Sequence, residues 1–187
     1  MKKIILFTLL IISILSCRKE NKEIICNGSN NDFSNLYNHL LSSGFADETT
    51  MDLEIHQFYF QLSQEMEICK IGYQSQTEIE NNPYLIEIID TTNNITLLSE
   101  SHTFSSNSTS YFAPSNSVKL DTSIVYLLRR TQTNWENFSN IIGRMATNNS
   151  ISFPYKNGVI TVLGSKFYQM GGPFYNCGIP FIDIVFK

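Results

Sequence analysis

Aromatic side chains in polar, loop-like segments are the residues of this chain best suited to binding a ligand. Three of them surround a Gly-Gly-Pro turn at residues 171–173, and the single tryptophan lies in a polar stretch. Exposed rings stack on the apolar faces of sugars, and loops on a β scaffold are common recognition surfaces. The sequence therefore predicts a binding surface that includes Trp135, Tyr168, Phe174 and Tyr175. The alternative is that these rings close one end of the hydrophobic core.

A cluster of oxygen-bearing side chains has the composition of a calcium site. Asp90, Asn93 and Asn94 fall on one predicted turn. Calcium takes about six to eight oxygen ligands, often from such loops. A structural calcium ion is therefore one interpretation, and a solvated turn without an ion is the other. No further cofactor is expected.

Motifs for enzymatic catalysis are absent from the sequence. It contains no HExxH or HxH, no GxSxG, no P-loop and no GxGxxG. Two acidic pairs, Glu78 with Glu80 and Glu87 with Asp90, have the residue types that glycoside hydrolases use. A chain with 17 acidic residues supplies such pairs by chance. A hydrolase is therefore the least favoured function class, and the chain is expected not to be an enzyme.

The first residues have the three-part layout of a secretory signal peptide. Lys2 and Lys3 give a positive start, residues 4–15 are apolar apart from Thr8 and Ser13, and a small residue follows. The apolar stretch has 12 residues, whereas a helix needs about 20 to span a bilayer. A permanent transmembrane helix is therefore disfavoured.

The sequence Ile14-Leu15-Ser16-Cys17 resembles the lipobox of bacterial lipoproteins. Leu15 is bulkier than the residue often found at that position. The resemblance implies that residues 1–16 are removed and that Cys17 becomes the lipid-bearing first residue of an envelope protein. It would be held at the outer membrane and face the periplasm or the cell surface. Two or more acyl chains anchor stably, whereas one holds only reversibly. A plain signal peptide with an incidental cysteine is the alternative.

A charged segment follows the cysteine. Residues 18–23 lack apolar side chains, so residues 17–31 are expected to form a solvated tether to a domain at residues 32–187. A lysine followed by acids is similar to surface-export signals of some lipoproteins, although Asn21 and Lys22 interrupt the acids here. A tether that carries no export signal is an equally good interpretation.

The charge balance excludes some partners. Without Lys2 and Lys3, 11 basic side chains remain against 17 acidic ones, a net charge near −6. Arg129-Arg130 is the one adjacent basic pair beyond the tether. Nucleic-acid binding needs clustered cations, so it is disfavoured, and an acidic domain is not drawn to anionic lipid heads.

Three cysteines remain after the lipid-bearing one. Cys69 alternates with apolar residues, which predicts a buried thiol on a strand, whereas Cys26 and Cys177 lie in polar segments near the two ends of the domain. An oxidising compartment permits a disulfide. We expect a Cys26–Cys177 bridge, with three free thiols as the alternative. No CxxC or Cys/His cluster indicates zinc.

One helix and eight to ten strands are predicted. An apolar stripe with spacing i, i+3, i+4, i+7 predicts a helix over residues 33–41. Residues 132–149 are polar and predict a long loop with at most one helical turn. Period-two alternation and turn residues predict the strands, which cover residues 53–62 with a bulge near Gln57, 68–75, 84–89, 96–103, 109–113, 123–130, 159–163, 166–170 and 179–186.

This pattern favours a mostly β fold, a single β-sandwich of jelly-roll type with one short N-terminal helix, with a closed barrel as the alternative. Residues 68–131 contain Ile-Gly, a Tyr-x-Ile-x-Ile-x-Asp strand, and Leu-Asp-Thr-x-Ile-Val-Tyr-Leu-Leu-Arg. This third of the chain resembles uncharacterised exported β-sandwich domains. The resemblance implies a sandwich and transfers no catalytic residue.

Three functions follow from these observations. The first is a lipid-anchored, non-enzymatic module that binds an envelope ligand, either a glycan or a partner protein. The second is a structural accessory subunit of an envelope complex. The third and least favoured is an envelope hydrolase.

Overall fold

The computed structural model describes residues 26, 31–51, 54–135, 142–148, 151–169 and 172–187. The predicted signal peptide, Cys17 and most of the predicted tether lie outside these residues. Within the described part of the chain, no helix has the length and apolar composition that a membrane span requires.

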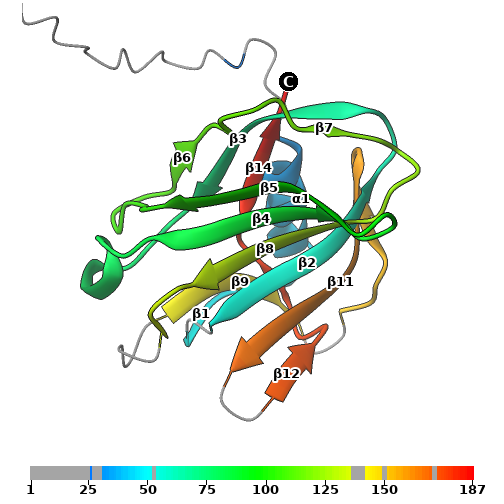
Figure 1. The fold of residues 1–187 in the computed structure, drawn as a ribbon. Coiled ribbons are helices and arrows are strands. Elements are labelled where there is room, and N and C mark those ends of the chain that lie inside the picture. The colour runs from blue at the N-terminus through cyan, green and yellow to red at the C-terminus, as the bar shows by residue number, and fades with distance from the viewer. Residues whose placement is uncertain (1–25, 27–30, 52–53, 136–141, 149–150, 170–171) are drawn as a thin grey trace, which may run out of the picture.

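The largest sheet in the described part of the chain has seven antiparallel strands. Viewed along the sheet, they follow the order β10 (Tyr155–Asn157), β11 (Ile160–Gln169), β2 (Ile55–Leu62), β8 (Tyr126–Gln132), β4 (Tyr84–Asp90) and β5 (Ile95–His102), and β12 (Gly172–Tyr175) pairs with β11. Figure 1 views this sheet from its solvent-facing side.

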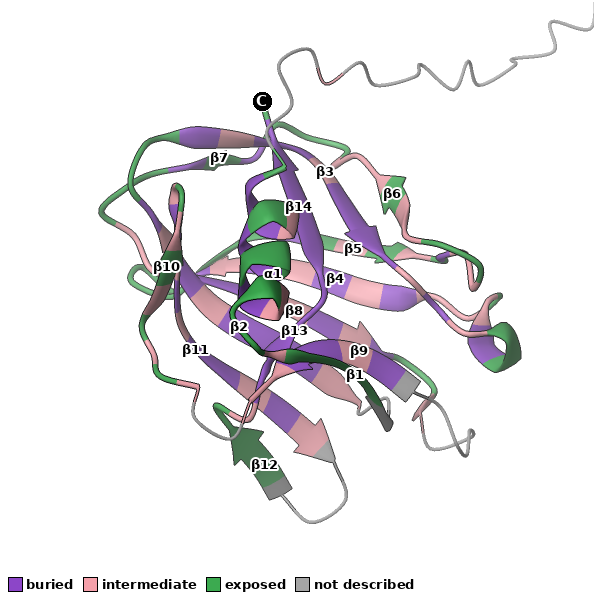
Figure 2. Ribbon diagram, turned by 180° about the vertical axis from the view of Figure 1, so that it is seen from behind, coloured by how far each residue is buried: buried purple, intermediate pink, exposed green. Residues whose placement is uncertain are grey.

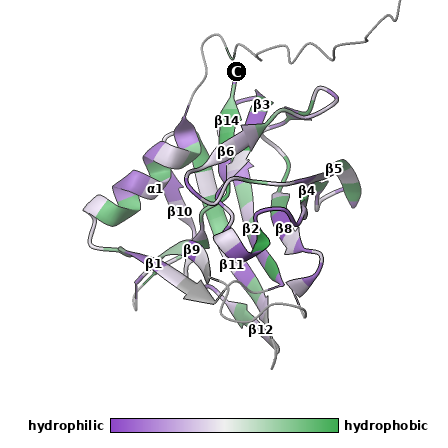
Figure 3. Cartoon of the chain, turned by 90° about the vertical axis from the view of Figure 1, so that its left-hand side faces the viewer, coloured by the Kyte–Doolittle hydropathy of each residue, from purple (hydrophilic) through white to green (hydrophobic). Residues whose placement is uncertain are grey.

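Two smaller antiparallel sheets and one helix form the second layer (Figures 2 and 3). The first sheet has the order β14 (Asp183–Phe186), β3 (Met66–Tyr73) and β6 (Ser110–Phe112), with β7 (Lys119–Leu120) also on β3. The second has the order β1 (Ala46–Met51), β9 (Ile142–Thr147) and β13 (Ile179–Pro180). A short 3₁₀ helix, η1 (Thr77–Ile79), lies between β3 and β4.

The helix α1 (Asp32–Ser42) confirms the predicted amphipathic helix. Phe33, Leu36 and Leu40 have no exposed surface, and α1 packs against β14 and the β10–β11 hairpin. Gly44 follows with φ +91°, a backbone conformation that glycine adopts without strain and that ends many helices. A helix this short gains its stability from tertiary packing.

Alternation along the strands gives the large sheet two different faces. Phe58, Leu128 and Ile88 lie opposite one another on β2, β8 and β4, and none has exposed surface. Burying each such side chain stabilises the fold by roughly 1.5–3 kcal/mol. These residues face the second layer, so the predicted mostly β sandwich with one N-terminal helix is confirmed.

Several strand predictions were wrong in detail. The polar strand β1 was not predicted, and β9 occupies part of the predicted 132–149 loop. The two strands predicted at 159–163 and 166–170 are one strand, β11. The register shift on this side of the sheet lies between Val162 and Gly164 of β11, not at Gln57. Tertiary pairing overrides local propensity in each case.

Candidate functional site

The solvent-facing side of the seven-stranded sheet, which we call the outer face, holds two of the four predicted ligand-binding aromatic residues, Tyr168 and Tyr175. Strand register places its residues in rows that cross the sheet. One row is mainly apolar and runs through Leu85, Thr131, Ile55 and Tyr168. A second consists of Ile89, Leu127 and Tyr59. Between them runs a polar row.

The polar row consists of Glu87, Arg129, Gln57, Lys166 and Tyr175, from β4 through β8, β2 and β11 to β12. The Arg129 Nε atom donates to Glu87 Oε2 at 2.7 Å. Gln57 is only 3% exposed, beneath its neighbours. Adjacent strands lie about 4.8 Å apart, so four steps cover about 19 Å. The row is therefore long enough for an extended ligand.

The end of this row is a group of two tyrosines around a lysine, which we call the tyrosine–lysine cluster. The Lys166 Nζ atom lies 4.6 Å from the ring centre of Tyr168 and 5.1 Å from that of Tyr175. Tyr175 is 63% exposed. Hydrogen bonding to Tyr168 raises the pKa of Lys166. None of the described acidic side chains forms an ion pair with Lys166.

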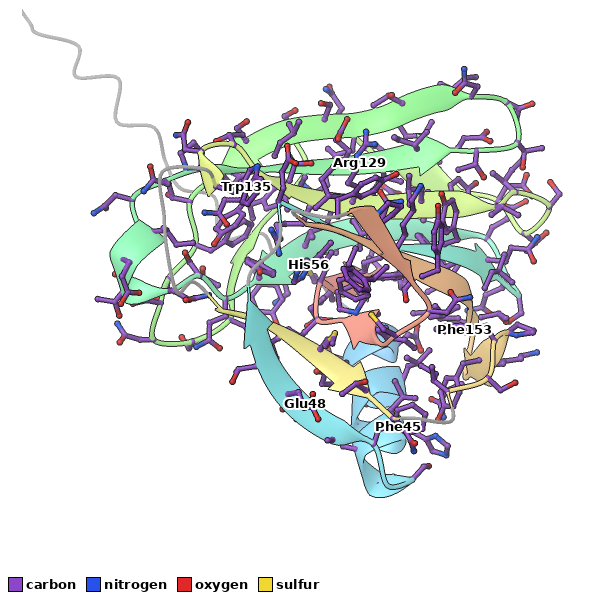
Figure 4. All side chains as sticks on the ribbon, turned by 90° about the horizontal axis from the view of Figure 1, so that it is seen from below. Phe45, Glu48, His56, Arg129, Trp135 and Phe153 are labelled. Carbon is purple, nitrogen blue, oxygen red and sulfur yellow. A yellow bond between two sulfur atoms is a disulfide. The ribbon has the colours of Figure 1, made fainter. Side chains whose placement is uncertain are left out.

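The four predicted ligand-binding aromatic residues do not form one surface. Tyr168 and Tyr175 share a face because Lys166 is two residues from the first and directly opposite the second. Phe174 pairs with the buried Phe167, so it lies on the other face of the hairpin. Trp135 is half-buried beyond the end of β8, and β2 separates that strand from β11 (Figure 4). The structure therefore brings together two of the four.

The inner face of the same sheet contains a second cation between tyrosines. Arg130 has no exposed surface, and its Cζ atom lies 5.1 Å from the Tyr73 ring centre and 5.2 Å from that of Tyr84. His56 lies opposite Arg130 and is also fully buried. Burial, together with the Arg130 charge, holds the pKa of His56 well below its usual value. This histidine is neutral at pH 7.

A cleft of about 310 Å³ lies between β9 and the segment that joins β3 to β4. This volume is at the lower end of the roughly 300–1,000 Å³ typical of small-molecule sites. Gln74 Nε2 donates to the Ser106 carbonyl at 3.0 Å, and Arg144 binds Asp47 through two nitrogens. Gln76 Nε2 is buried without a hydrogen-bond partner among the described residues. Sequence analysis did not predict this cleft, and the polar run that follows β3 is the one feature that could have indicated it.

The proposed calcium ligands lie on the β4–β5 turn, where Asp90 has another role. Its Oδ1 atom accepts hydrogen bonds from the backbone of Thr92 at 2.9 Å and Asn93 at 2.8 Å. Its Oδ2 atom accepts one from Asn93 Nδ2. Asn94 has φ +57° and completes the turn. The turn geometry accounts for Asp90 without an ion, and calcium binding stays a prediction.

Three of the four residues in the predicted acidic pairs, Glu80, Glu87 and Asp90, are engaged in structural interactions. Glu80 accepts hydrogen bonds from the backbone and the hydroxyl of Ser106 at 3.2 and 3.1 Å. Glu87 is bound to Arg129. Within the described part of the chain, no group of three His, Cys, Asp or Glu side chains is placed to hold a metal ion.

The predicted Cys26–Cys177 disulfide is wrong. The structure joins Cys26 to Cys69 on β3, with 5.9 Å between the two Cα atoms. Cys177 is a free thiol beside Met145 and Phe167, and burial raises its pKa. The prediction failed because the two ends of the domain were assumed to meet. Instead, Cys26 is joined to a residue in the middle of β3.

Comparison with known proteins does not indicate a family or a function for this chain. No protein-family model matches the chain, and no curated protein is significantly similar to it.

Proposed function

We propose that this chain is a lipid-anchored, non-enzymatic module that binds an extended glycan on its outer face. The observation that carries the proposal is the tyrosine–lysine cluster at the end of the polar row. Tyr168 and Tyr175 offer ring surface for stacking, and Lys166 offers an ammonium group that none of the described acidic side chains neutralises. This combination fits a sugar that bears a carboxylate or a sulfate.

The rest of the outer face complements a chain of sugars. The polar row supplies donors and acceptors at strand spacing, while the flanking rows supply aliphatic and aromatic surface. Its groups lie on paired strands of a sheet, which are more rigid than loops. A binding face of this kind needs no catalytic residue.

The lipid at Cys17 is proposed to hold the module at the outer membrane, facing the periplasm or the cell surface. The Cys26–Cys69 disulfide supports export, because disulfides persist in oxidising compartments and are rare in the cytosol. Incorporation of labelled palmitate into the wild-type chain, and its loss in Cys17→Ser, is the expected result. Unchanged membrane fractionation of Cys17→Ser would contradict the anchor.

A second candidate function is an accessory subunit of an envelope complex. Strand β5 is an edge of the large sheet, and its side chains Ile95 and Leu97 are 53% and 37% exposed. Edge strands with exposed apolar residues pair readily with another chain. Crosslinking and recovery of the anchored chain from its native membrane tests this function. An Ile95→Lys variant should lose the partner and retain the glycan.

The glycan proposal is tested with the mature domain on a panel of neutral, uronate-bearing and sulfated polysaccharides. We expect retention by acidic members, weakened in Tyr175→Ala. Phe174→Ala is the matched control, because it removes an exposed ring from the opposite face of the same hairpin. Absence of binding to every member, or equal weakening by both variants, would contradict the proposal.

A further inference from the structure

We infer that the outer face has a second subsite for an anionic group, at Lys156, and that the ligand is a polyanion whose charged groups occupy both subsites at once. The inference rests on the proposed function and deepens it, because it names the ligand class. That class is a glycan with several acidic groups along its length, in place of a glycan with a single acidic group.

Three polar side chains on neighbouring strands form the second subsite, which we call the β10 row. Lys156 of β10 lies opposite Thr161 of β11, and Thr161 lies opposite Gln61 of β2. Residues directly opposite one another in an antiparallel pair share a face, and the two neighbours of Thr161 in β11 have no exposed surface. The β10 row therefore lies on the outer face, together with Lys166.

The side chains of the β10 row are available to a ligand. Lys156 is exposed, and Thr161 and Gln61 are half-buried. Among the described residues, none of these three side chains has a hydrogen-bond or ion-pair partner. An ammonium group, a hydroxyl and an amide therefore lie side by side on paired strands. Such a group suits a carboxylate or a sulfate flanked by the hydroxyl groups of a sugar.

The two subsites are too far apart for one anion. Gln57 and Gln61 mark the two rows on β2, and Lys156 is one strand further out than Lys166, so the backbone positions of the two lysines lie about 14 Å apart. This exceeds the Debye length of about 8 Å at physiological ionic strength. Lys166 is also held beside Tyr168, which lies one row further from Lys156. A ligand that uses both ammonium groups therefore carries at least two anionic groups.

The surface between the two subsites offers an aromatic ring and an amide. Tyr59 lies opposite Gly164 in the row between them, and it is half-buried. Asn176 lies over Gly164, because a Cβ atom there would be 2.9 Å from Asn176 Oδ1. That oxygen accepts a hydrogen bond from the backbone of Ser165, and the exposed amide keeps its nitrogen as a donor. A sugar chain that follows β2 and β11 can therefore stack on Tyr59 between its two charged groups (Figure 1).

The charge distribution of the molecule favours a polyanion at this face. Among the described strand residues of the outer face, Arg129, Lys156 and Lys166 are basic and Glu87 is the one acid, so the face carries a charge near +2. Without residues 1–16, the chain has a net charge near −6. The rest of the molecule therefore repels a polyanion, whereas the outer face attracts it.

The test compares affinities for ligands that differ in their number of charges. The probes are polygalacturonate and dextran sulfate, which are charged along their length, and a neutral oligosaccharide that ends in one galacturonate. Lys156→Gln should weaken binding of both polyanions about two- to fivefold and leave binding of the singly charged oligosaccharide unchanged. Lys166→Gln should weaken binding of all three. Lys119→Gln is the matched control, because it removes the same charge from an exposed lysine on β7, in the other layer, and it should change none of the affinities.

The outcomes separate the second subsite from the proposed function. Unchanged affinity of Lys156→Gln for both polyanions would overturn the second subsite and leave the glycan proposal intact. An equal loss of affinity for the singly charged oligosaccharide, or an equal loss in Lys119→Gln, would also overturn it, since a separate subsite on this face produces neither. If the wild-type chain bound none of the three probes, the proposed function would be refuted, and the inference with it.

Discussion

Each face of the seven-stranded sheet has a basic side chain beside two tyrosines, and the two groups have opposite surroundings. On the inner face, Arg130 lies between Tyr73 and Tyr84 and has no exposed surface. On the outer face, Lys166 lies beside Tyr168 and Tyr175, both open to solvent to different degrees. Cation–π contacts are worth about 0.5–1 kcal/mol when exposed and about 2 kcal/mol or more when desolvated.

The difference in burial between Arg130 and Lys166 distinguishes a side chain that stabilises the fold from one that is proposed to bind a ligand. The buried Arg130 has a structural role. If it is removed, its buried neighbours lose their interaction with the guanidinium group in a region of low dielectric. The partly exposed Lys166 is expected to contribute little to stability, and in the proposed function it is available to a ligand. Residue type is therefore a poor indicator of a site, and exposure is the deciding property.

The largest expected effect is on the inner face. Arg130→Ala should lower the free energy of unfolding by about 3–5 kcal/mol, because it removes one member of a fully buried polar cluster and leaves a cavity. Urea unfolding measures this loss. Lys166→Ala is the matched change on the outer face and should stay within about 0.5 kcal/mol of the wild type. If both variants lost a similar free energy of unfolding, the proposed difference between the two faces would be wrong.

The next effect is on ligand binding at the outer face. Removing both rings in Tyr168→Ala/Tyr175→Ala should cost about 1–3 kcal/mol of affinity, or roughly 5- to 150-fold, from about 0.5–1.5 kcal/mol for each ring. Binding isotherms with an acidic polysaccharide measure it. Thermal unfolding should change little, and a large drop in Tm with unchanged affinity would assign these rings to the core.

A pH titration gives a smaller effect on the inner face. The lowered pKa of His56 means that the unfolded chain takes up a proton before the folded one does. Stability should be complete above about pH 6.5 and should fall by about 1–2 kcal/mol between pH 7 and 5, before most carboxylates titrate. Urea unfolding at a series of pH values measures the slope. The slope should flatten in His56→Gln, and an unchanged slope would show that another group causes it.

The smallest expected effect distinguishes two partly exposed lysines, Lys166 and Lys70, each of which lies over a tyrosine ring. Lys166→Gln should weaken binding of an acidic polysaccharide a few-fold, about 0.5–1 kcal/mol, and leave binding of a neutral one unchanged. Lys70, whose Nζ atom is 4.4 Å from the Tyr111 ring centre, lies on the other layer. Lys70→Gln should have no effect on either ligand. Equal weakening of neutral and acidic ligands would rule out a charge-specific role.

The sequence predicted those parts of the fold where a local pattern agrees with the tertiary structure. The apolar stripe of α1 and the alternation of β4 both appear as predicted. Strand β9 was missed because Met145 and Ala146 are buried by pairing with distant strands, in a segment whose own composition is polar. Contact between distant segments also explains why the disulfide was predicted wrongly. Cys69 is bonded to Cys26, which lies before the predicted domain at residues 32–187.

The candidate site was predictable as a set of residue types and not as an arrangement. Aromatic residues around the Gly-Gly-Pro turn pointed to the β11–β12 hairpin. Register then decides that Tyr175 joins Lys166 while Phe174 does not. The adjacent pair Arg129-Arg130 shows the same limit, since alternation directs Arg129 to Glu87 outside and Arg130 to the tyrosines inside. The alternation of side chains along each strand was visible in the sequence. Which residues of a strand face the core and which face solvent was not.

The most direct measurement of the central claim is NMR mapping of an acidic oligosaccharide on the mature domain. Shifts are predicted to concentrate on Tyr168, Tyr175 and Lys166, to extend along the polar row, and to leave Tyr73 and Tyr84 unmoved. Shifts confined to the β5 edge or to the cleft beside β9, or none anywhere at saturating ligand, would contradict the account.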